Sequence, residues 1–278
     1  MENPVLEMRQ VCIRYEDETV VNNFNLKVFP GQIVGIAGES GSGKSTALRA
    51  AMGLLNEEGH VDSGEIFFDG RDLRQLSARE FQSLRGQGIG MVFQNTAASL
   101  CPVRTIGDQF QEMLRQHGRA NQKENREEIL SLLDSLGFPN GERILASYPF
   151  ELSGGMNQRV GIALAMILKP KLLLADEPTS ALDVTVQAQV MGELMQLRKL
   201  YGTSIVIVAH NIGLLYHMTD YLLVMKDGQV AEEGNTKELI ANPRSEYTKK
   251  LIQSVVQLKR RKRHGSGVGS EKSQQSLQ

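Results

Sequence analysis

The sequence predicts an α/β fold with a mostly parallel sheet, an antiparallel β region near the N-terminus and an inserted helical region. Short segments that are almost wholly apolar recur at residues 33–37, 171–176 and 204–209, which is typical of strands buried on both faces of a parallel sheet. Segments of helical periodicity lie between them. From residue 105 to residue 146 strand signals vanish and apolar residues recur at helical spacing, which predicts a helical insertion.

The first part of the chain predicts β structure around one glycine-rich loop. Residues 6–15 and 20–28 mix apolar and polar positions in the manner of strands, and a Pro-Gly pair ends the second. The apolar segment 33–37 predicts a buried strand, and residues 47–52 predict a helix after the loop. Strand, glycine-rich loop and helix therefore follow one another directly.

The later elements follow from similar signals. Residues 64–70 predict a strand closed by an Asp-Gly turn, and Ser77 and Glu80 have the capping-box spacing that starts a short helix. The other expected elements are strands at 88–93, 171–176, 204–209, 221–225 and 229–233, and helices at 160–168, 184–201 and 247–257.

We expect one domain over residues 1–257, with a helical subdomain at about 95–168, and a tail at 258–278. The tail begins with a basic run at 259–264 and continues in Gly, Ser and Gln. Because this composition buries too little apolar surface to fold, the tail is predicted to be disordered. A solubilising role is favoured over contact with anionic lipid. Within the insertion, His117 and the charges of 123–128 are interpreted as a solvated face.

The composition excludes several classes of protein. The 278 residues carry a formal net charge of −1, which argues against binding nucleic acid through bulk positive charge. No apolar run is long enough to span a bilayer, and the N-terminal residues lack the basic and apolar regions of a signal peptide, so a cytosolic location is expected. Cys12 and Cys101 share no metal-binding or redox spacing.

The glycine-rich loop fits the phosphate-binding pattern G-x-x-x-x-G-K-[ST]. Its glycines let successive backbone N–H groups face phosphate oxygens, and the helix that follows adds the partial positive charge of its N-terminus. Lys44 is expected to reach the β- and γ-phosphates, and the Ser45 hydroxyl is expected to hold Mg²⁺. The loop comprises Gly38, Glu39, Ser40, Gly41, Ser42, Gly43, Lys44, Ser45 and Thr46.

Polar residues stand at the ends of three expected strands. They are Gln94, the Asp176-Glu177 pair and His210. Ligands of open α/β sheets bind beyond the carboxyl ends of the strands, so these side chains are expected to face one ligand. Asp176 is expected to help hold Mg²⁺, and Glu177 to orient and deprotonate an attacking water.

Two further features are less specific. Ser153 and the two glycines after it open a helix whose bare N–H groups suit an anion, although Ser-Gly-Gly is also an ordinary helix start. Tyr15 falls between the first two strands, where edge packing and a functional role remain equally open.

The order of these features resembles the ATP-binding-cassette (ABC) ATPases. The resemblance runs from Leu6 to Glu233, and Leu-Ser-Gly-Gly upstream of the Asp-Glu strand is its most specific part. It implies that Tyr15 stacks on adenine, that Gln94 senses Mg²⁺ and the attacking water, and that Glu177 is the general base. His210 would contact the γ-phosphate. A signature segment would contact the γ-phosphate held by a facing subunit; its residues are Leu152, Ser153, Gly154, Gly155, Met156 and Gln158.

The facing arrangement also has a physical reason. The second anion-binding helix start lies beyond the helical insertion, so one copy can hardly fold it over its own phosphate loop. Two copies placed head to tail would form two complete sites. The resemblance implies in addition that Asp183 signals across the interface. ATP and Mg²⁺ are the expected cofactors.

Three stretches resemble the oligopeptide, dipeptide and nickel import branch of this family, namely residues 94–102, 154–159 and 242–248. The chain departs from the branch pattern at Thr96, Cys101 and Asn157 and at residues 245–246. Some relatives in this branch carry clustered cysteines for an iron–sulfur centre. No cysteine follows Cys101 here, so no iron–sulfur cluster is expected.

The resemblance implies an ATP-hydrolysing subunit that powers an importer of oligopeptides, dipeptides, or nickel and metal–chelator complexes. Its partners would be a second ABC ATPase subunit of the same or a different chain, two transmembrane permease subunits and, indirectly, an extracytoplasmic substrate-binding protein, with no nucleic acid. It would lie peripherally on the cytoplasmic face of the cell membrane. A soluble ribosome- or DNA-associated ABC ATPase and an exporter cassette are the alternatives. The sequence leaves the cargo open.

Overall fold

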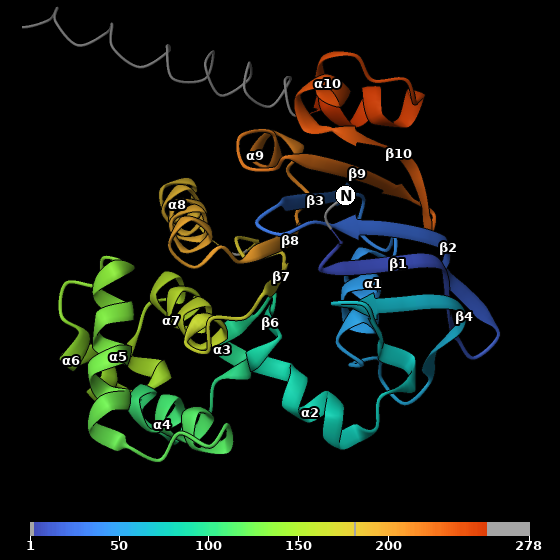
Figure 1. The fold of residues 1–278 in the computed structure, drawn as a ribbon. Helices are drawn as coiled ribbons and strands as arrows, with labels where there is room; N and C mark the ends of the chain where they lie inside the picture. The colour runs from blue at the N-terminus through green and yellow to red at the C-terminus, as the bar shows by residue number, and fades with distance from the viewer. Residues whose placement is uncertain (1–2, 181, 255–278) are drawn as a thin grey trace, which may run out of the picture.

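Two sheets organise the part of the chain that the structure describes (Figure 1). The structure, a computed structural model, describes residues 3–180 and 182–254. The first sheet is antiparallel with the order β2-β1-β4-β5, which confirms the predicted N-terminal β region. Its strands are β1 (Leu6–Tyr15), β2 (Glu18–Val28), β4 (Gly59–Phe68) and β5 (Arg71–Asp72).

The second sheet is mostly parallel and has the order β10-β9-β3-β8-β7-β6. Only β10 runs antiparallel to its neighbour. This confirms the predicted α/β class. The strands are β3 (Ile33–Gly38), β6 (Ile89–Val92), β7 (Leu172–Asp176), β8 (Ser204–Val208), β9 (Tyr221–Lys226) and β10 (Gln229–Asn235).

Helices surround the parallel sheet and build a separate lobe (Figure 1). Helix α7 begins at Gly154, earlier than the predicted start at residue 160. Residues 246–254 are helical, and the rest of the helix predicted to reach residue 257, like the predicted tail, lies outside the described residues. The helices are α1 (Lys44–Ala51), α2 (Ala78–Gln87), α3 (Thr96–Ser99), α4 (Ile106–Gln116), α5 (Gln122–Ser135), α6 (Gly141–Ala146), α7 (Gly154–Met166), α8 (Val184–Tyr201), α9 (Ile212–Tyr216) and α10 (Thr236–Ala241), with short 3₁₀ turns at Leu73–Gln75 and Pro149–Glu151.

The parallel sheet separates two apolar cores. One face packs with α1 and the antiparallel sheet, and the other packs with the helices that follow β6. Strand β3 shows the division, because Val34 and Ile36 belong to the first core and Ile33 and Ala37 to the second. All six residues of β3 are buried, which explains its uninterrupted apolar sequence.

Helices α4, α5 and α6 form the lobe predicted as a helical insertion (Figure 1). The interpretation of His117 as part of a solvated face was wrong, whereas Lys123, Glu124, Arg126 and Glu127 are exposed as expected. The ring nitrogens of His117 lie 3.0 Å from the Met113 carbonyl and 2.9 Å from the Arg85 carbonyl, so His117 links the end of α4 to α2. Asn125 is buried and donates to the Arg119 carbonyl at 3.1 Å. Both side chains satisfy backbone oxygens that sequence periodicity does not reveal.

In the described part of the chain, no helix has both the length and the apolar character that crossing a membrane requires.

Candidate functional site

The glycine-rich loop joins the carboxyl end of β3 to the first turn of α1 and fits closely against its neighbours. A Cβ atom on Gly38 would lie 2.3 Å from the Met225 carbonyl oxygen, and one on Gly43 would lie 2.9 Å from the Val20 carbonyl oxygen. Gly43 also has φ of 90°, where a side chain is strained. The loop therefore needs glycine at both positions to hold its path between β2 and β9.

Lys44 is buried beneath this loop and is 4% exposed. Its ammonium group donates to the Gly38 carbonyl at 3.0 Å, the Glu39 carbonyl at 2.5 Å and the Ser42 hydroxyl at 3.2 Å. Burial lowers the pKa of Lys44, and the charge of Glu177 is the strongest influence in the opposite direction. A partly desolvated ammonium with neutral partners binds an anion strongly, because few waters must be displaced.

The end of β7 lies beside the start of α1. The Ser45 hydroxyl donates to Oδ1 of Asp176 at 2.6 Å, and Asp176 is 1% exposed. A hydroxyl and a carboxylate are the hard oxygen ligands that Mg²⁺ prefers, and Mg²⁺ is usually held by one or two such groups together with substrate phosphates. The residues present therefore fit the predicted metal ion.

Glu177, at the tip of β7, is held by groups from both neighbouring strands. Its Oε2 accepts a hydrogen bond from Nε2 of Gln94 at 2.9 Å, and its Oε1 lies 2.5 Å from Nε2 of His210. The other ring nitrogen of His210 lies 3.2 Å from the Gly38 carbonyl. Glu177 has φ of 47°, a rare conformation for a residue with a side chain. The structure thus brings together the three strand-end groups singled out in the sequence.

The signature segment lies apart from this cluster. Ser153 is exposed and caps α7 by accepting a hydrogen bond from the Met156 backbone at 3.3 Å. Asp183 is also exposed and caps α8 through the backbone N–H groups of Thr185 and Val186 at 2.9 and 3.0 Å. Within the described residues, neither side chain makes a hydrogen bond to the phosphate loop. The two helix starts adjoin, since a Cβ on Gly155 would lie 2.7 Å from Val186.

Tyr15, at the end of β1, packs against β4. A Cβ atom on Gly59 would lie 2.6 Å from the Tyr15 ring, so glycine is needed there to admit the ring. Tyr15 is partly exposed. Part of the ring is therefore packed against β4, and stacking of Tyr15 on adenine stays a prediction.

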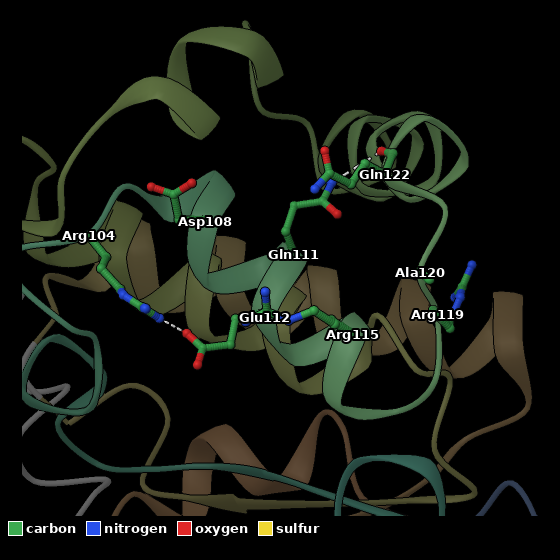
Figure 2. Close-up of a pocket in the computed structure, with 8 residues that line it drawn as sticks. All are labelled: Arg104, Asp108, Gln111, Glu112, Arg115, Arg119, Ala120 and Gln122. Atoms are coloured by element: carbon green, nitrogen blue, oxygen red, sulfur yellow. Dashed lines mark hydrogen bonds and ion pairs between the residues drawn. The ribbon is translucent and has the colours of Figure 1, made fainter.

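A separate hollow of about 330 Å³ lies on the helical lobe (Figure 2). Some of its lining residues contact one another. Arg104 pairs with Glu112, and Gln111 donates to the Gln122 carbonyl at 3.3 Å. These residues were not predicted as a site, and Arg119 pairs with Glu128, which does not line the hollow.

Comparison with known proteins decides the family. A family model described as "ABC transporter" matches residues 21–180. The dipeptide transport ATP-binding protein DppD of Haemophilus influenzae is 38% identical over 255 residues, covering 90% of this chain and 77% of that protein. The oligopeptide transport ATP-binding protein OppD of Salmonella typhimurium is 39% identical over 260 residues, covering 92% and 77%. This chain belongs to the ABC transporter family.

Solved structures agree with this ABC assignment. The ATP-binding cassette MJ0796, in a dimeric post-hydrolysis state bound to ADP and Pi, has a TM-score of 0.73 and 30% identity, covering 83% of this chain and 98% of that one. The cbiO1 protein of Clostridium perfringens, part of the transporter complex cbiONQ, has a TM-score of 0.74 and 28% identity, covering 96% and 100%. The predicted resemblance and fold are confirmed.

Sequence patterns did not reveal the buried ion pair between Arg159 and Glu193 of this ABC cassette. Nε of Arg159 on α7 donates to Oε1 of Glu193 on α8 at 2.5 Å, and the Arg159 guanidinium lies 4.1 Å from the ring centroid of Phe138. Arg159 also donates to the Leu136 carbonyl. Burial raises the pKa of Glu193, and the charge of Arg159 opposes that rise. Arg159 therefore ties the signature helix to α8 and to the helical lobe.

Replacing Arg159 with methionine is expected to reduce the free energy of unfolding of this cassette by about 3–5 kcal/mol, because Glu193 is left buried without its partner. Chemical denaturation of both proteins measures the loss. The double variant Arg159→Met with Glu193→Leu should recover most of the stability, since neither charge remains buried. A single variant as stable as the wild type would contradict the assigned role of the pair.

Proposed function

We propose that this ABC protein is an ATP-hydrolysing subunit that powers the import of oligopeptides or dipeptides. The observation that carries the proposal is the meeting of Gln94, Glu177 and His210 beside the buried ammonium group of Lys44. The names of the relatives, which are dipeptide and oligopeptide transport proteins, support the cargo class.

Nucleotide binding follows from the loop. The ammonium group of Lys44 would exchange its contacts with loop carbonyls for the β- and γ-phosphates, and the N–H groups at the start of α1 would face the same oxygens. Tyr15 would stack on adenine. Ser45 and Asp176 would hold Mg²⁺ with Gln94 nearby, and the bound ion would neutralise charge on the phosphates.

Hydrolysis follows from the position of Glu177. A carboxylate has about four acceptor sites, so Glu177 can keep its contact to Gln94 and still accept a hydrogen bond from a water, while Nε2 of His210 would leave Glu177 for the γ-phosphoryl oxygens. That water would attack the γ-phosphorus while its proton passes to Glu177, and the bond from phosphorus to the ADP oxygen would break. Lys44 and His210 would stabilise the charge on the γ-phosphoryl oxygens.

A second cassette would complete each site. Ser153 and the exposed N-terminus of α7 are free of the phosphate loop of their own chain in the described structure, and a helix N-terminus favours an anion. In a head-to-tail pair the signature segment would meet the γ-phosphate of the facing subunit, with Asp183 at the same interface. The partner would be a second copy or a different cassette.

The permease would dock where the loop around Gln94 meets the helical lobe. An apolar groove of about 300 Å³ lies there and is lined in part by Phe93, Leu100 and Met113. Phe150 lies four residues before the start of α7 and is 72% exposed. Its ring stacks on that of Tyr148, with ring centroids 5.4 Å apart. Exposed aromatic residues typify protein interfaces. Two permease subunits would therefore hold the chain on the cytoplasmic face of the membrane, with an extracytoplasmic substrate-binding protein acting indirectly.

The test of this function is uptake of a labelled dipeptide by cells whose own gene for this protein is deleted and which produce the wild-type chain or a variant instead. The wild-type chain should restore uptake and should be recovered with membranes that contain the permease, whereas Lys44→Ala should restore none. Lys199→Ala, on the exposed surface of α8, is the matched control and should behave as the wild type. Restored uptake of nickel in place of the dipeptide would contradict the proposed cargo. Recovery only in the supernatant would contradict the peripheral membrane placement.

A further inference from the structure

The phosphate loop has a contact that the mechanism above does not use. The backbone N–H of Glu39, the second residue of the loop, donates to the hydroxyl of Tyr247 at 3.0 Å. Tyr247 lies near the start of the helical segment 246–254, 208 residues away in sequence. The carbonyl of the same Glu39 accepts from the ammonium group of Lys44 at 2.5 Å. Glu39 therefore connects the C-terminal helical segment to the buried lysine.

Tyr247 is held in place from several directions. The ammonium group of Lys226, at the end of β9, lies 5.5 Å from its ring centroid. The Glu232 carboxylate on β10 accepts hydrogen bonds from the backbone N–H groups of Arg244 and Ser245, at 2.8 and 3.0 Å, just before the helical segment. Tyr247, Leu251 and Ile252 also pack on the apolar core. Because these contacts hold Tyr247, its hydroxyl can fix the position of the Glu39 peptide that donates to it.

The loop needs such a support when nucleotide binds. Once Lys44 turns toward phosphate oxygens, the Glu39 carbonyl loses that partner, and the contact to Tyr247 is the remaining side-chain hydrogen bond of the Glu39 backbone within the described residues. On the other side of the peptide, Gly38 is confined by the Met225 carbonyl, since a Cβ atom there would lie 2.3 Å from it. Residues 38 and 39 are thus held between β9 and the C-terminal helical segment.

We propose that Tyr247 is a positioning residue for ATP binding, which acts through the Glu39 peptide to keep the phosphate loop in its binding conformation. The inference rests on the proposed ATP hydrolysis. It assigns to the C-terminal helical segment a direct influence on the nucleotide site of its own chain. The loop is positioned equally for ground state and transition state, so the effect should fall on affinity and leave kcat unchanged.

Tyr247→Phe in the full chain tests this, because the substitution removes the hydroxyl and keeps the ring. We expect the Kd for MgATP, measured by titration calorimetry, and the KM for ATP to rise about 3- to 10-fold with kcat retained, as for the loss of one hydrogen bond. The melting temperature should change little. Tyr216→Phe is the matched control: Tyr216 is 39% exposed on α9, and the variant should bind MgATP as the wild type does.

A second variant tests whether Tyr247 acts through the Glu39 peptide. Glu39→Pro removes the donating N–H, so adding Tyr247→Phe to it should change the Kd within about twofold. An independent further loss of affinity in the double variant would overturn the proposal, and so would an unchanged Kd in Tyr247→Phe while the wild type binds and hydrolyses ATP. A wild-type chain that neither binds nor hydrolyses ATP would overturn the proposed function as well.

Discussion

Replacing Glu177 with glutamine is expected to lower kcat for ATP hydrolysis by about 10²- to 10⁴-fold, the usual contribution of a general base. Glutamine has the shape of glutamate and can still accept a hydrogen bond from Gln94, which lies 2.9 Å from the carboxylate. It cannot take a proton from water. MgATP binding should persist, because Lys44 and the phosphate loop are unchanged. Single-turnover hydrolysis and equilibrium binding of the same protein separate the two effects.

Glu124→Gln is a matched control, since it makes the same change on the exposed first turn of α5. Its kcat should equal that of the wild type. If Glu177→Gln hydrolyses ATP at the wild-type rate, another group removes the proton and the role given to Glu177 is wrong. If it loses MgATP binding instead, the carboxylate serves mainly to hold the site together.

Replacing Ser153 with glutamate is expected to prevent ATP-dependent pairing of two cassettes. In a head-to-tail pair this residue would face the γ-phosphate of the partner, and like charges brought together cost several kcal/mol, enough to weaken pairing by about 100-fold or more. The Glu177→Gln chain with MgATP should elute as a dimer in size-exclusion chromatography. The same chain with Ser153→Glu added should elute as a monomer that still binds MgATP, because Ser153 is exposed and makes no hydrogen bond to its own loop in the described structure.

Ser131→Glu supplies the control, because it adds the same charge at an exposed position of α5 and should leave the dimer intact. A dimer that survives Ser153→Glu would show that the signature segment does not face a triphosphate. A monomer that has also lost MgATP binding would show instead that Ser153 serves the site of its own chain.

Local sequence patterns predicted most elements of the fold. The strands, the long helix α8 and the capping box at Ser77 depend on residues close in sequence, so periodicity and spacing reveal them. The order of strands in the sheet could not be obtained in this way. Strand β3 pairs with β8 and β9, which follow it by more than 160 residues, through backbone hydrogen bonds along its two edges that leave no pattern in the sequence.

The polar interior was the least predictable part. Arg159, Asn125 and His117 resemble surface residues in the sequence, yet each has a buried or backbone partner brought by another element. A polar side chain becomes an internal link only when packing removes water from it and supplies a partner. Spacing along one helix carries no information about that partner.

The sequence alone determined the phosphate loop, the polar groups at the strand ends and the family resemblance, because these depend on residue types at short, fixed spacings. Only the tertiary structure decided which of these groups touch. Ser45 meets Asp176 across 131 residues, and Gln94 meets Glu177 across 83. The contact of Tyr247 with Glu39 spans 208 residues and has no sequence pattern of its own. Such contacts arise because the sheet places the ends of distant strands side by side, and chain folding fixes that order.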